Sequence, residues 1–574
     1  MRRYRSLLPL VGFCLLASLG LFVDVHSQRA RIALLACLAG YVWTYLSALK
    51  EVRRNRHAVL RLDEPKPWLV PLSLFLPGTV LGLSLSLPHT RAFLVGTTGL
   101  LIIAVALYLL GVWLLIRDLK LEQLEAQRRL SPAVSTAKSK KLLLVNPVNP
   151  VKNGLTMNTS STFPPLGLGI LAALTPDDYE IVLADENMEP FCYQDADLVG
   201  ITAFTSSAPR AYEIAAMYRE QNIPVVLGGI HASMCPEEAH KHADSVVIGE
   251  AEGVWPQVIL DFEAGQLRRT YQGDHLGLEG AVIPRRDLFS ERYLFDTIQT
   301  SRGCPMDCHF CSVTPFNGRT YRQRPAEEVL AELETIQSPF IFFVDDNLLG
   351  YGKEAESRAI AIFRGMVERK LNKSWFCQAS LNFGSNDEVL RWASRAGCKM
   401  VFIGLESADP EELKVMHKNL NLRLDYHQAF KRIHRHKIAV LGAFIFGADS
   451  ETGQSMMRKA RYILEEDVDV IQTTIMTPLP GTRLFSQYAS EERFRIPLDE
   501  SAWARFDMSE LTFHLRHMSD EDFAKTLREC SKMLYSRRTL FQKFVRTWIS
   551  TRSLETAFWA YSSNKNYRAV NLSR

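Results

Sequence analysis

Short β-rich segments alternate with helical stretches over most of the chain after residue 139, and this pattern constrains the fold more than any other feature. The first series reads "KLLLV", "EIVLAD", "LVGIT", "VVLGG" and "SVVIG". Strands that alternate with helices form a parallel sheet covered by helices on both faces. The series therefore predicts a doubly wound α/β domain, whose ligand crevice lies at the carboxyl ends of the strands.

The loops after these strands supply candidate ligand contacts. Two adjacent glycines allow a close backbone approach to a bulky flat ligand, and nearby hydroxyls can donate hydrogen bonds. Each loop alone is more typical of an ordinary strand-to-helix turn than of a ligand site, and the single histidine among them is more typical of a satisfied core or surface residue than of a ligand. The candidates are Thr202, Thr205, Ser206, Gly228, Gly229 and His231.

Three cysteines lie within eight residues in the segment "SRGCPMDCHFCSV". The spacing of Cys304, Cys308 and Cys311 is compatible with a zinc site, a disulfide plus one thiol, or an iron–sulfur cluster. Structural zinc signatures bring a second Cys or His pair at short range, which is missing here. The other seven cysteines are scattered, so they do not indicate a disulfide framework. Three thiolates that hold a [4Fe–4S] cluster and leave one iron open are the favoured interpretation.

A second strand–helix series follows the cysteines, with strand-like segments "FIFFVDDN", "WFCQAS", "MVFIGLES", "VLGAFIFGAD" and "VIQTTIMTPLPGT". Together with "DTIQTS" before the cysteines and Phe310 before the third cysteine, the series resembles the barrel of radical S-adenosylmethionine (SAM) enzymes. The preceding segments "FPPLGLGILAAL", "VVLGGIHAS" and "VVIGEAEG" resemble the cobalamin-binding domain that many of these enzymes carry before the barrel. The chain lacks an Asp-x-His-x-x-Gly motif, so the resemblance implies cobalamin bound without a protein histidine on cobalt.

The resemblance implies a partial (β/α)6 barrel whose chemistry lies at the carboxyl ends of its strands. It places Phe310 near the adenine of SAM, and polar groups at three strand ends near the methionyl ammonium or the ribose. Each of these groups alone could equally be a helix N-cap or a solvated turn. Asp449 and Gln472 are weaker candidates, and Cys377 and Cys398 are expected to be packed thiols. The strand-end groups are Asp345, Asp346, Asn347, Gln378, Ser380, Glu406 and Ser407.

The implied cofactors are a [4Fe–4S] cluster, SAM and cobalamin. Such an enzyme takes an electron from a donor such as a flavodoxin or ferredoxin, cleaves SAM to a 5′-deoxyadenosyl radical and removes hydrogen from an unactivated carbon. C-methylation through cobalamin is the leading expectation. Ring contraction, cyclisation and carbon–carbon coupling stay open, as do two readings of another class, a membrane-tethered iron–sulfur redox sensor and a cobalamin-binding signalling module.

Four apolar runs without acidic or basic residues occupy residues 7–23, 32–49, 68–87 and 92–116. Each is long enough to cross a hydrocarbon core, which takes roughly 17 to 25 helical residues. A cleaved signal peptide is the alternative for the first run alone. Lys and Arg concentrate on one side of the four runs, which places both ends of this unit in the cytoplasm. We therefore expect a multi-pass protein of the inner membrane with cytoplasmic catalytic domains, and a lipid or other hydrophobic substrate.

The net charge of +4 is too balanced to indicate nucleic-acid binding. In the last segment, Phe541, Phe544, Val545 and Trp548 recur at helical spacing beside basic Lys543, Arg546 and Arg552. This stripe predicts either a helix on a membrane surface or a helix packed on the barrel by its aromatic side. The expected organisation is an anchor over 1–117, a linker over 118–138, a cobalamin-binding-type domain over 139–275, a radical SAM barrel over 290–490 and a helical region over 491–574.

Overall fold

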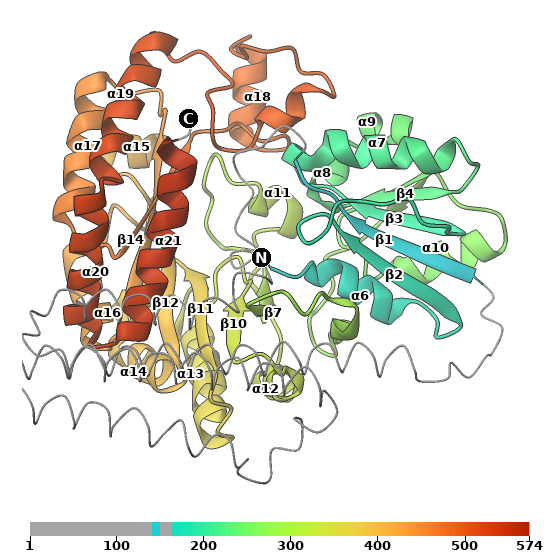
Figure 1. Cartoon of the computed structure of the whole chain (residues 1–574), viewed down its shortest axis with the longest axis horizontal. Coiled ribbons are helices and arrows are strands. Elements are labelled where there is room, and N and C mark those ends of the chain that lie inside the picture. The colour runs from blue at the N-terminus through green and yellow to red at the C-terminus, as the bar shows by residue number, and fades with distance from the viewer. Residues whose placement is uncertain (1–139, 150–162, 573–574) are drawn as a thin grey trace, which may run out of the picture. The chain divides into compact units, whose positions relative to one another are not determined.

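The computed structural model describes residues 140–149 and 163–572, which are coloured in Figure 1. Within these ranges no helix combines the length and the hydropathy needed to span a bilayer. The four apolar runs that predict the anchor, and the linker after them, lie outside the described residues.

The first sheet consists of six parallel strands in the order β2-β1-β3-β4-β5-β6. Strand β1 lies between β2 and β3, so the chain direction across the sheet reverses there, and a ligand crevice is expected at the carboxyl ends of β1 and β3. The predicted strands are all present. The elements are β1 (Lys140–Asn146), α6 (Leu166–Leu174), β2 (Tyr179–Asp185), β3 (Leu198–Thr202), η2 (Thr205–Ser207), α7 (Ala208–Arg219), β4 (Val225–Gly228), α8 (Gly229–Met234), α9 (Pro236–His242), β5 (Ser245–Ile248), α10 (Trp255–Glu263) and β6 (Thr270–Gln272).

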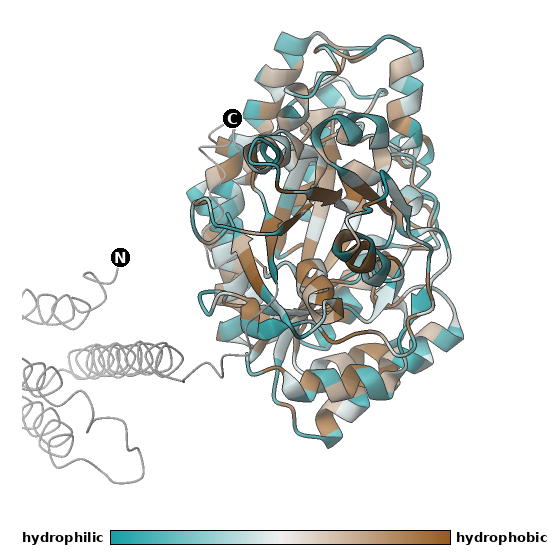
Figure 2. Cartoon of the chain, turned by 90° about the vertical axis from the view of Figure 1, so that its right-hand side faces the viewer, coloured by the Kyte–Doolittle hydropathy of each residue, from teal (hydrophilic) through white to brown (hydrophobic). Residues whose placement is uncertain are grey.

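Helices cover both faces of this sheet because consecutive side chains of a strand point in opposite directions. Leu143 and Val145 of β1 pack into one core with residues of α7 and α8, whereas Leu142 and Leu144 pack into another with residues of α6 and α10. Figure 2 shows the brown of hydrophobic residues concentrated on strands and inward helix faces. A parallel sheet buried in this way explains why its strands read as continuous apolar runs.

The second sheet is also parallel, in the order β14-β13-β12-β11-β10-β7, and forms an open barrel with helices outside. The expected α/β fold with parallel sheets is confirmed. Its elements are η3 (Arg286–Leu288), β7 (Asp296–Ile298), the ribbon β8 (Ser301–Arg302) and β9 (Arg322–Gln323), α11 (Val313–Asn317), α12 (Ala326–Thr335), β10 (Phe340–Phe343), α13 (Lys353–Glu368), β11 (Ser374–Ala379), η4 (Leu381–Ser385), α14 (Asp387–Arg395), β12 (Cys398–Glu406), α15 (Pro410–Val415), α16 (Tyr426–Arg435), β13 (Ala439–Phe446), α17 (Gly453–Glu465), β14 (Val470–Ile475), α18 (Arg483–Ser490) and η5 (Ala502–Arg505).

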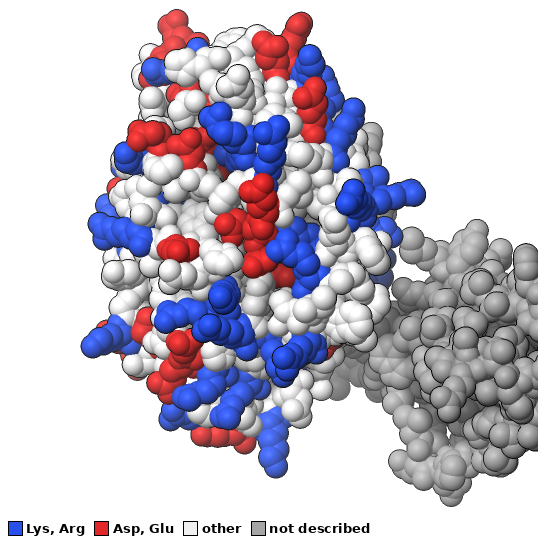
Figure 3. Space-filling model, turned by 90° about the vertical axis from the view of Figure 1, so that its left-hand side faces the viewer, with Lys and Arg blue, Asp and Glu red and all other residues white. Residues whose placement is uncertain are grey.

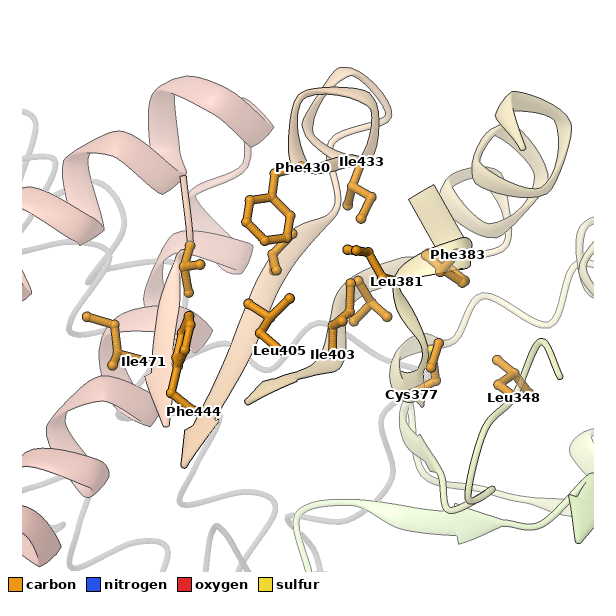
Figure 4. Packing of buried hydrophobic residues seen from close by; sticks show 14 of the residues in the cluster. Leu348, Cys377, Leu381, Phe383, Ile403, Leu405, Phe430, Ile433, Phe444 and Ile471 are labelled. Carbon is orange, nitrogen blue, oxygen red and sulfur yellow. The ribbon is translucent and has the colours of Figure 1, made fainter. Parts of the chain in front are cut away.

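The barrel strands alternate between a helix-facing core and the barrel interior. Trp375 and Cys377 of β11 are buried in the core against the helices, part of which Figure 4 shows. Cys377 and Cys398 are buried thiols, as expected. On the opposite side, Phe342 and Phe376 are only partly buried and stack with ring centroids 4.3 Å apart. The interior of the barrel is therefore lined by aromatic side chains.

Three helices end the chain: α19 (Asp520–Leu534), α20 (Arg537–Thr551) and α21 (Leu554–Leu572). Helix α21 packs on β14, where Asn564 donates to the Asp469 carbonyl and accepts from the Ile471 amide. Ala560 joins the apolar cluster formed by the starts of the barrel strands, and the hydroxyl of Tyr567 donates to Gln472 at 2.5 Å. The helix therefore closes the amino-terminal end of the barrel.

Of the two orientations that the sequence predicts for α20, the one in which its aromatic side packs on the barrel is wrong. Its buried face consists of Leu540, Lys543, Thr547 and Thr551, not of the aromatic stripe. The Lys543 ammonium donates to the Glu466 carbonyl at 3.0 Å instead of adding positive charge to the surface. Thr547 donates to the buried carboxylate of Asp469 at 2.7 Å. Hydrogen bonds thus seat a polar face against the barrel, and the aromatic residues remain outside.

Candidate functional site

The three cysteines lie on the loop between β8 and β9, at the carboxyl end of β7. Gly303 begins this loop with a φ of +83°, and a Cβ there would lie 2.3 Å from the Thr320 carbonyl oxygen, so only glycine fits. The carboxylate of Asp346 closes the loop, because it accepts from the Gly303 amide at 3.1 Å and from the Asn317 side chain at 2.9 Å. A side chain at the end of the adjacent strand β10 therefore holds the cysteine loop in place.

The thiols of Cys304, Cys308 and Cys311 are partly buried and lie close enough to influence each other electrostatically. Burial raises the pKa of all three, to about 12 for Cys311. In the described residues no three His, Cys, Asp or Glu side chains are arranged to hold a single metal ion. Three neighbouring thiols fit a cluster, because binding iron replaces their protons. A lysine ammonium lies near them and lowers the pKa of all three.

That lysine is Lys418, which sequence reasoning missed. Its ammonium lies 2.7 Å from the Glu406 carboxylate. Although burial opposes the charge, Glu406 and the thiol of Cys308 raise the pKa of Lys418. Glu406 itself has a φ of +62°, and the pairing of β12 with β13 shifts register at this point. Such a strained bulge re-aims a side chain at the end of a strand. A Cβ at Gly404 would lie 2.5 Å from the Glu406 carboxylate, so that glycine makes room for the ion pair.

The second and third strand ends meet at the first cysteine. The Asn347 amide donates to the Ser380 hydroxyl at 3.0 Å and accepts from the Ser380 amide at 3.3 Å. Its hydrogen bond to the Cys304 thiol opposes the effect of burial on that thiol's pKa. Gln378 lies on the interior side of β11 by the alternation of that strand. These residues are brought together as the sequence predicts.

Two predicted ligand contacts have other roles. Asp345 is fully buried and accepts from the Thr300 amide at 3.0 Å and from the Ser301 hydroxyl. It therefore holds the strand that enters the cysteine loop, while its contact with SAM stays a prediction. Ser407 is also buried, and its hydroxyl accepts from the Asp409 amide at 3.0 Å. Ser407 therefore stabilises a turn, which is the alternative role that the sequence allows for it.

The remaining barrel candidates are Phe310, Asp449 and Gln472. Phe310 is partly buried and packs against the barrel core. Asp449 pairs with Arg493, and Gln472 accepts from Tyr567 inside the barrel, so both of these weaker candidates have structural partners.

In the first domain, the predicted residues separate into an accessible and a buried set. Thr202, Ser206 and Gly228 are partly exposed at the carboxyl ends of β3 and β4. A Cβ at Gly228 would meet only Val247, at 3.8 Å, whereas Gly229 needs its φ of +90° and has Thr202 and Ala203 within 2.9 Å of a Cβ position. Gly229 is therefore required by the packing of its own loop. The accessible hydroxyls and the bare backbone of Gly228 fit a cofactor that is held without a metal-ligating side chain.

His231 lies in a buried hydrogen-bond network. Its ring is fully buried, with Nδ1 3.4 Å from the Thr205 hydroxyl and Nε2 3.2 Å from Glu238. Glu238 also accepts from the Tyr212 hydroxyl at 2.8 Å and from the Trp503 indole at 2.9 Å. His231 and Thr205 thus belong to a core network, the alternative that the sequence favoured for this histidine taken alone.

Charged contacts join the two domains beside the cysteine loop. Glu250, in the loop after β5, accepts from Arg302 at 3.1 Å and from Arg322 at 2.9 Å, and Arg302 also pairs with Glu252. Although burial opposes it, the two arginines lower the pKa of Glu250. The segment "GEAEG" is visible in the sequence. Its arginine partners are not, because they lie more than fifty residues further along the chain.

Comparisons with known proteins match these two domains. Residues 298–463 match the Radical SAM superfamily and residues 153–259 match the B12 binding domain. The computed fold resembles the structure of the cobalamin-dependent S-adenosylmethionine radical enzyme OxsB with aqua-cobalamin bound, with a TM-score of 0.54, 16% identity and coverage of 73% of this chain and 72% of that one. The chain is therefore a radical SAM enzyme with a B12-binding domain, and the expected cofactors, a [4Fe–4S] cluster, SAM and cobalamin, are confirmed by the two domains.

Two relatives are similar to this chain in sequence over more than half of its length. A bacteriochlorophyllide d C-12(1)-methyltransferase of Chlorobaculum tepidum is 29% identical over 413 residues, which cover 68% of this chain and 88% of the relative. A hopanoid C-2 methylase of Rhodopseudomonas palustris is 27% identical over 349 residues, which cover 58% of this chain and 66% of the relative.

Proposed function

We propose that the protein transfers a methyl group to an unactivated carbon of a hydrophobic molecule. The observation that carries this proposal is the set of ion pairs that Glu250 forms with Arg302 and Arg322, because it joins the B12-binding domain to β8 and β9, the two strands that flank the cysteine loop. An enzyme that passes a methyl group between two cofactors requires the two cofactor-binding domains to be held in a fixed relative position. The relatives support the same reaction, since their names are those of methylating enzymes.

The residues of this chain would hold the cofactors as follows. Cys304, Cys308 and Cys311 would ligate the cluster, while Asn347 and Ser380 lie at the adjacent strand ends. Thr202, Ser206 and Gly228 would face cobalamin. When bound, the cluster and SAM supply radical chemistry and cobalamin supplies the methyl carrier, so the protein's task is positioning and exclusion of water.

A hydrophobic substrate is supported by the barrel interior. Phe163, in the segment that leads into α6, lies 4.7 Å from Phe342 and 5.9 Å from Phe376 between ring centroids. These partly buried rings pack with Phe295 and with Trp559 of α21 into an aromatic cluster on the interior side of β11, the side on which Gln378 lies. The two relatives act on a bacteriochlorophyllide and a hopanoid, by their names. The four apolar runs of residues 7–116 support a membrane anchor that keeps such a substrate within reach.

The test is anaerobic reconstitution of the full chain with iron, sulfide, cobalamin, a reductant and SAM that carries a deuterated methyl group, together with a lipid extract. Mass spectrometry should find the labelled methyl group in an extracted hydrophobic molecule, and the Cys308→Ala variant should produce none. Formation of 5′-deoxyadenosine with a changed but unlabelled product would instead indicate cyclisation, ring contraction or carbon–carbon coupling.

A further inference from the structure

Helices α20 and α21 carry an unusual concentration of exposed apolar side chains. Seven of the nineteen exposed large hydrophobic residues in the described ranges lie between residues 541 and 572. Phe541 is 65% exposed, Ile549 is 69% exposed and Trp548 is 47% exposed. The other exposed residues of this segment are Leu554, Phe558, Tyr561 and Leu572.

These side chains form one surface that spans both helices, here called the aromatic face and defined as Phe541, Trp548, Ile549, Leu554, Phe558 and Tyr561. Phe544 of α20 joins its two halves, because its ring centroid lies 5.2 Å from that of Phe558 and 5.9 Å from that of Tyr561. A continuous apolar surface with several aromatic rings marks an interaction site on most soluble domains.

The barrel does not explain this face. Helix α21 already packs on β14 with its other side, through Ala557, Ala560 and Asn564. Helix α20 is seated by Lys543 and Thr547. A helix that covers a barrel needs one apolar or hydrogen-bonding side only, whereas α21 is apolar on two.

The charge around the aromatic face selects its partner. Between residues 536 and 572 the chain has seven basic residues and one acidic residue, Glu555, which is paired with Lys399. Three of the seven basic side chains are engaged within the protein, since Lys543 and Arg568 donate to backbone carbonyls and Arg546 pairs with Asp467. Figure 3 shows basic and acidic side chains interspersed with uncharged surface on the side of the molecule where α17 and α20 lie. The other exposed basic residues of the segment are Arg537, Arg538, Arg552 and Lys565.

We propose that the aromatic face docks on an anionic lipid bilayer. Aromatic side chains that enter the interfacial region and basic side chains that reach the lipid phosphates are the pattern of a peripheral membrane helix. The four apolar runs in residues 7–116 would hold the chain at the same bilayer, so docking costs little additional translational freedom. The docking itself is independent of the reaction, but its purpose rests on the proposed hydrophobic substrate.

The first experiment uses the full chain reconstituted in nanodiscs that contain brominated phosphatidylglycerol. Bromine quenches tryptophan fluorescence at close range, and the difference between the wild-type chain and Trp548→Phe isolates the contribution of Trp548. We expect that contribution to be quenched in brominated discs and to recover at high salt, because salt screens the basic residues. An unquenched Trp548 contribution at low salt would overturn the proposal.

The second experiment compares hydrogen exchange of α20 and α21 in phosphatidylglycerol nanodiscs and in neutral detergent. Phe541→Ser/Ile549→Ser should lose the lipid-dependent protection, while the equally exposed Leu260→Ser on α10 should keep it. Cleavage of SAM in detergent should be the same for all three proteins, so failure of docking and failure of the proposed reaction are separate results. Protection that is equal in detergent and in discs would show that another part of the chain, or a second copy, covers the face, and would contradict bilayer docking.

Discussion

Glu250 and Arg322 form an ion pair between the B12-binding domain and the barrel, with Oε2 of the carboxylate 2.9 Å from Nη1 of the guanidinium. The same carboxylate accepts from Arg302, which directly precedes Gly303 and the first cysteine of the loop. All three side chains are largely buried. An unpaired charge is strongly disfavoured in such an environment. The contact therefore sets where one cofactor domain lies relative to the other.

Glu250→Gln should separate the two halves of the reaction. It leaves two buried arginines with one carboxylate fewer, which typically destabilises such a contact by about 3 kcal/mol. We expect cluster assembly and SAM cleavage to continue, while labelled methyl transfer falls relative to 5′-deoxyadenosine. The ratio of the two products measures this effect. Glu213→Gln, which alters an exposed ion pair of the same domain with Arg210, is the control and should keep the wild-type ratio.

Replacement of any one of Cys304, Cys308 and Cys311 by Ala should abolish the cluster and the formation of 5′-deoxyadenosine together. Two thiolates cannot hold the cluster that three thiolates hold with one open iron. Iron content, the absorbance of the reconstituted protein and 5′-deoxyadenosine are the readouts. Cys398→Ala removes a buried thiol outside the loop and should retain all three. A chain without the three loop thiols that still cleaves SAM would contradict the assignment.

Gly229→Ala should weaken cobalamin binding through the loop rather than through the cofactor. The residue has a φ of +90°, and a methyl group would lie 2.7 Å from the Thr202 hydroxyl and 2.8 Å from the Ala203 amide. We expect a loss of roughly 1 to 3 kcal/mol in stability and a lower cobalamin occupancy by visible absorbance. Gly167→Ala, on α6 with no atom within 4 Å of its Cβ position, should leave occupancy unchanged.

Lys543 should make the stability of the barrel increase with pH above neutrality. Burial lowers the pKa of its ammonium to about 8, from an ordinary value of 10.5. Between these two values the unfolded chain binds more protons than the folded one, so the free energy of unfolding rises with pH, by up to about 3 kcal/mol. Below pH 8 both states are protonated, and the burial penalty applies in full.

Urea denaturation of the wild type and of Lys543→Met at pH 7 and pH 10 measures this contribution. The stability difference between the two proteins should change by the stated amount in favour of the wild type as the pH rises. A constant difference would mean that the ammonium is solvated in the folded state.

Topology reporters test the proposed anchor directly. Fusions after Ile116 should report the cytoplasm, and fusions in the segment 24–31 should report the opposite side, because Lys and Arg concentrate on the flanks that face the cytoplasm. The reverse pattern would place the cysteines in an oxidising compartment and contradict the proposed organisation.

The ends of the strands could be predicted because they depend on local features of the sequence, namely the apolar runs and the turn residues that follow them. Asn347 and Ser380 lie where the strand-like runs stop, and the fold brings them together. The burial of Asp345 could not be predicted, because it depends on Thr300 and Ser301, which reach it across the sheet. The buried face of α20 was missed for a related reason: apolar periodicity favours Phe541 and Trp548, whereas Thr547 is buried by a hydrogen bond to Asp469.

Glu238 accepts hydrogen bonds from residues made at very different times during synthesis. Tyr212 and His231 are close to it in sequence, whereas Trp503 follows it by 265 residues. Domains fold as units while the ribosome extends the chain. The first domain can therefore form its Tyr212–Glu238–His231 core early, but the indole that completes the network leaves the ribosome only after every barrel strand has been made. A nascent chain halted before Trp503 should thus hold a folded first domain whose Glu238 has one hydrogen-bond donor fewer than in the finished protein.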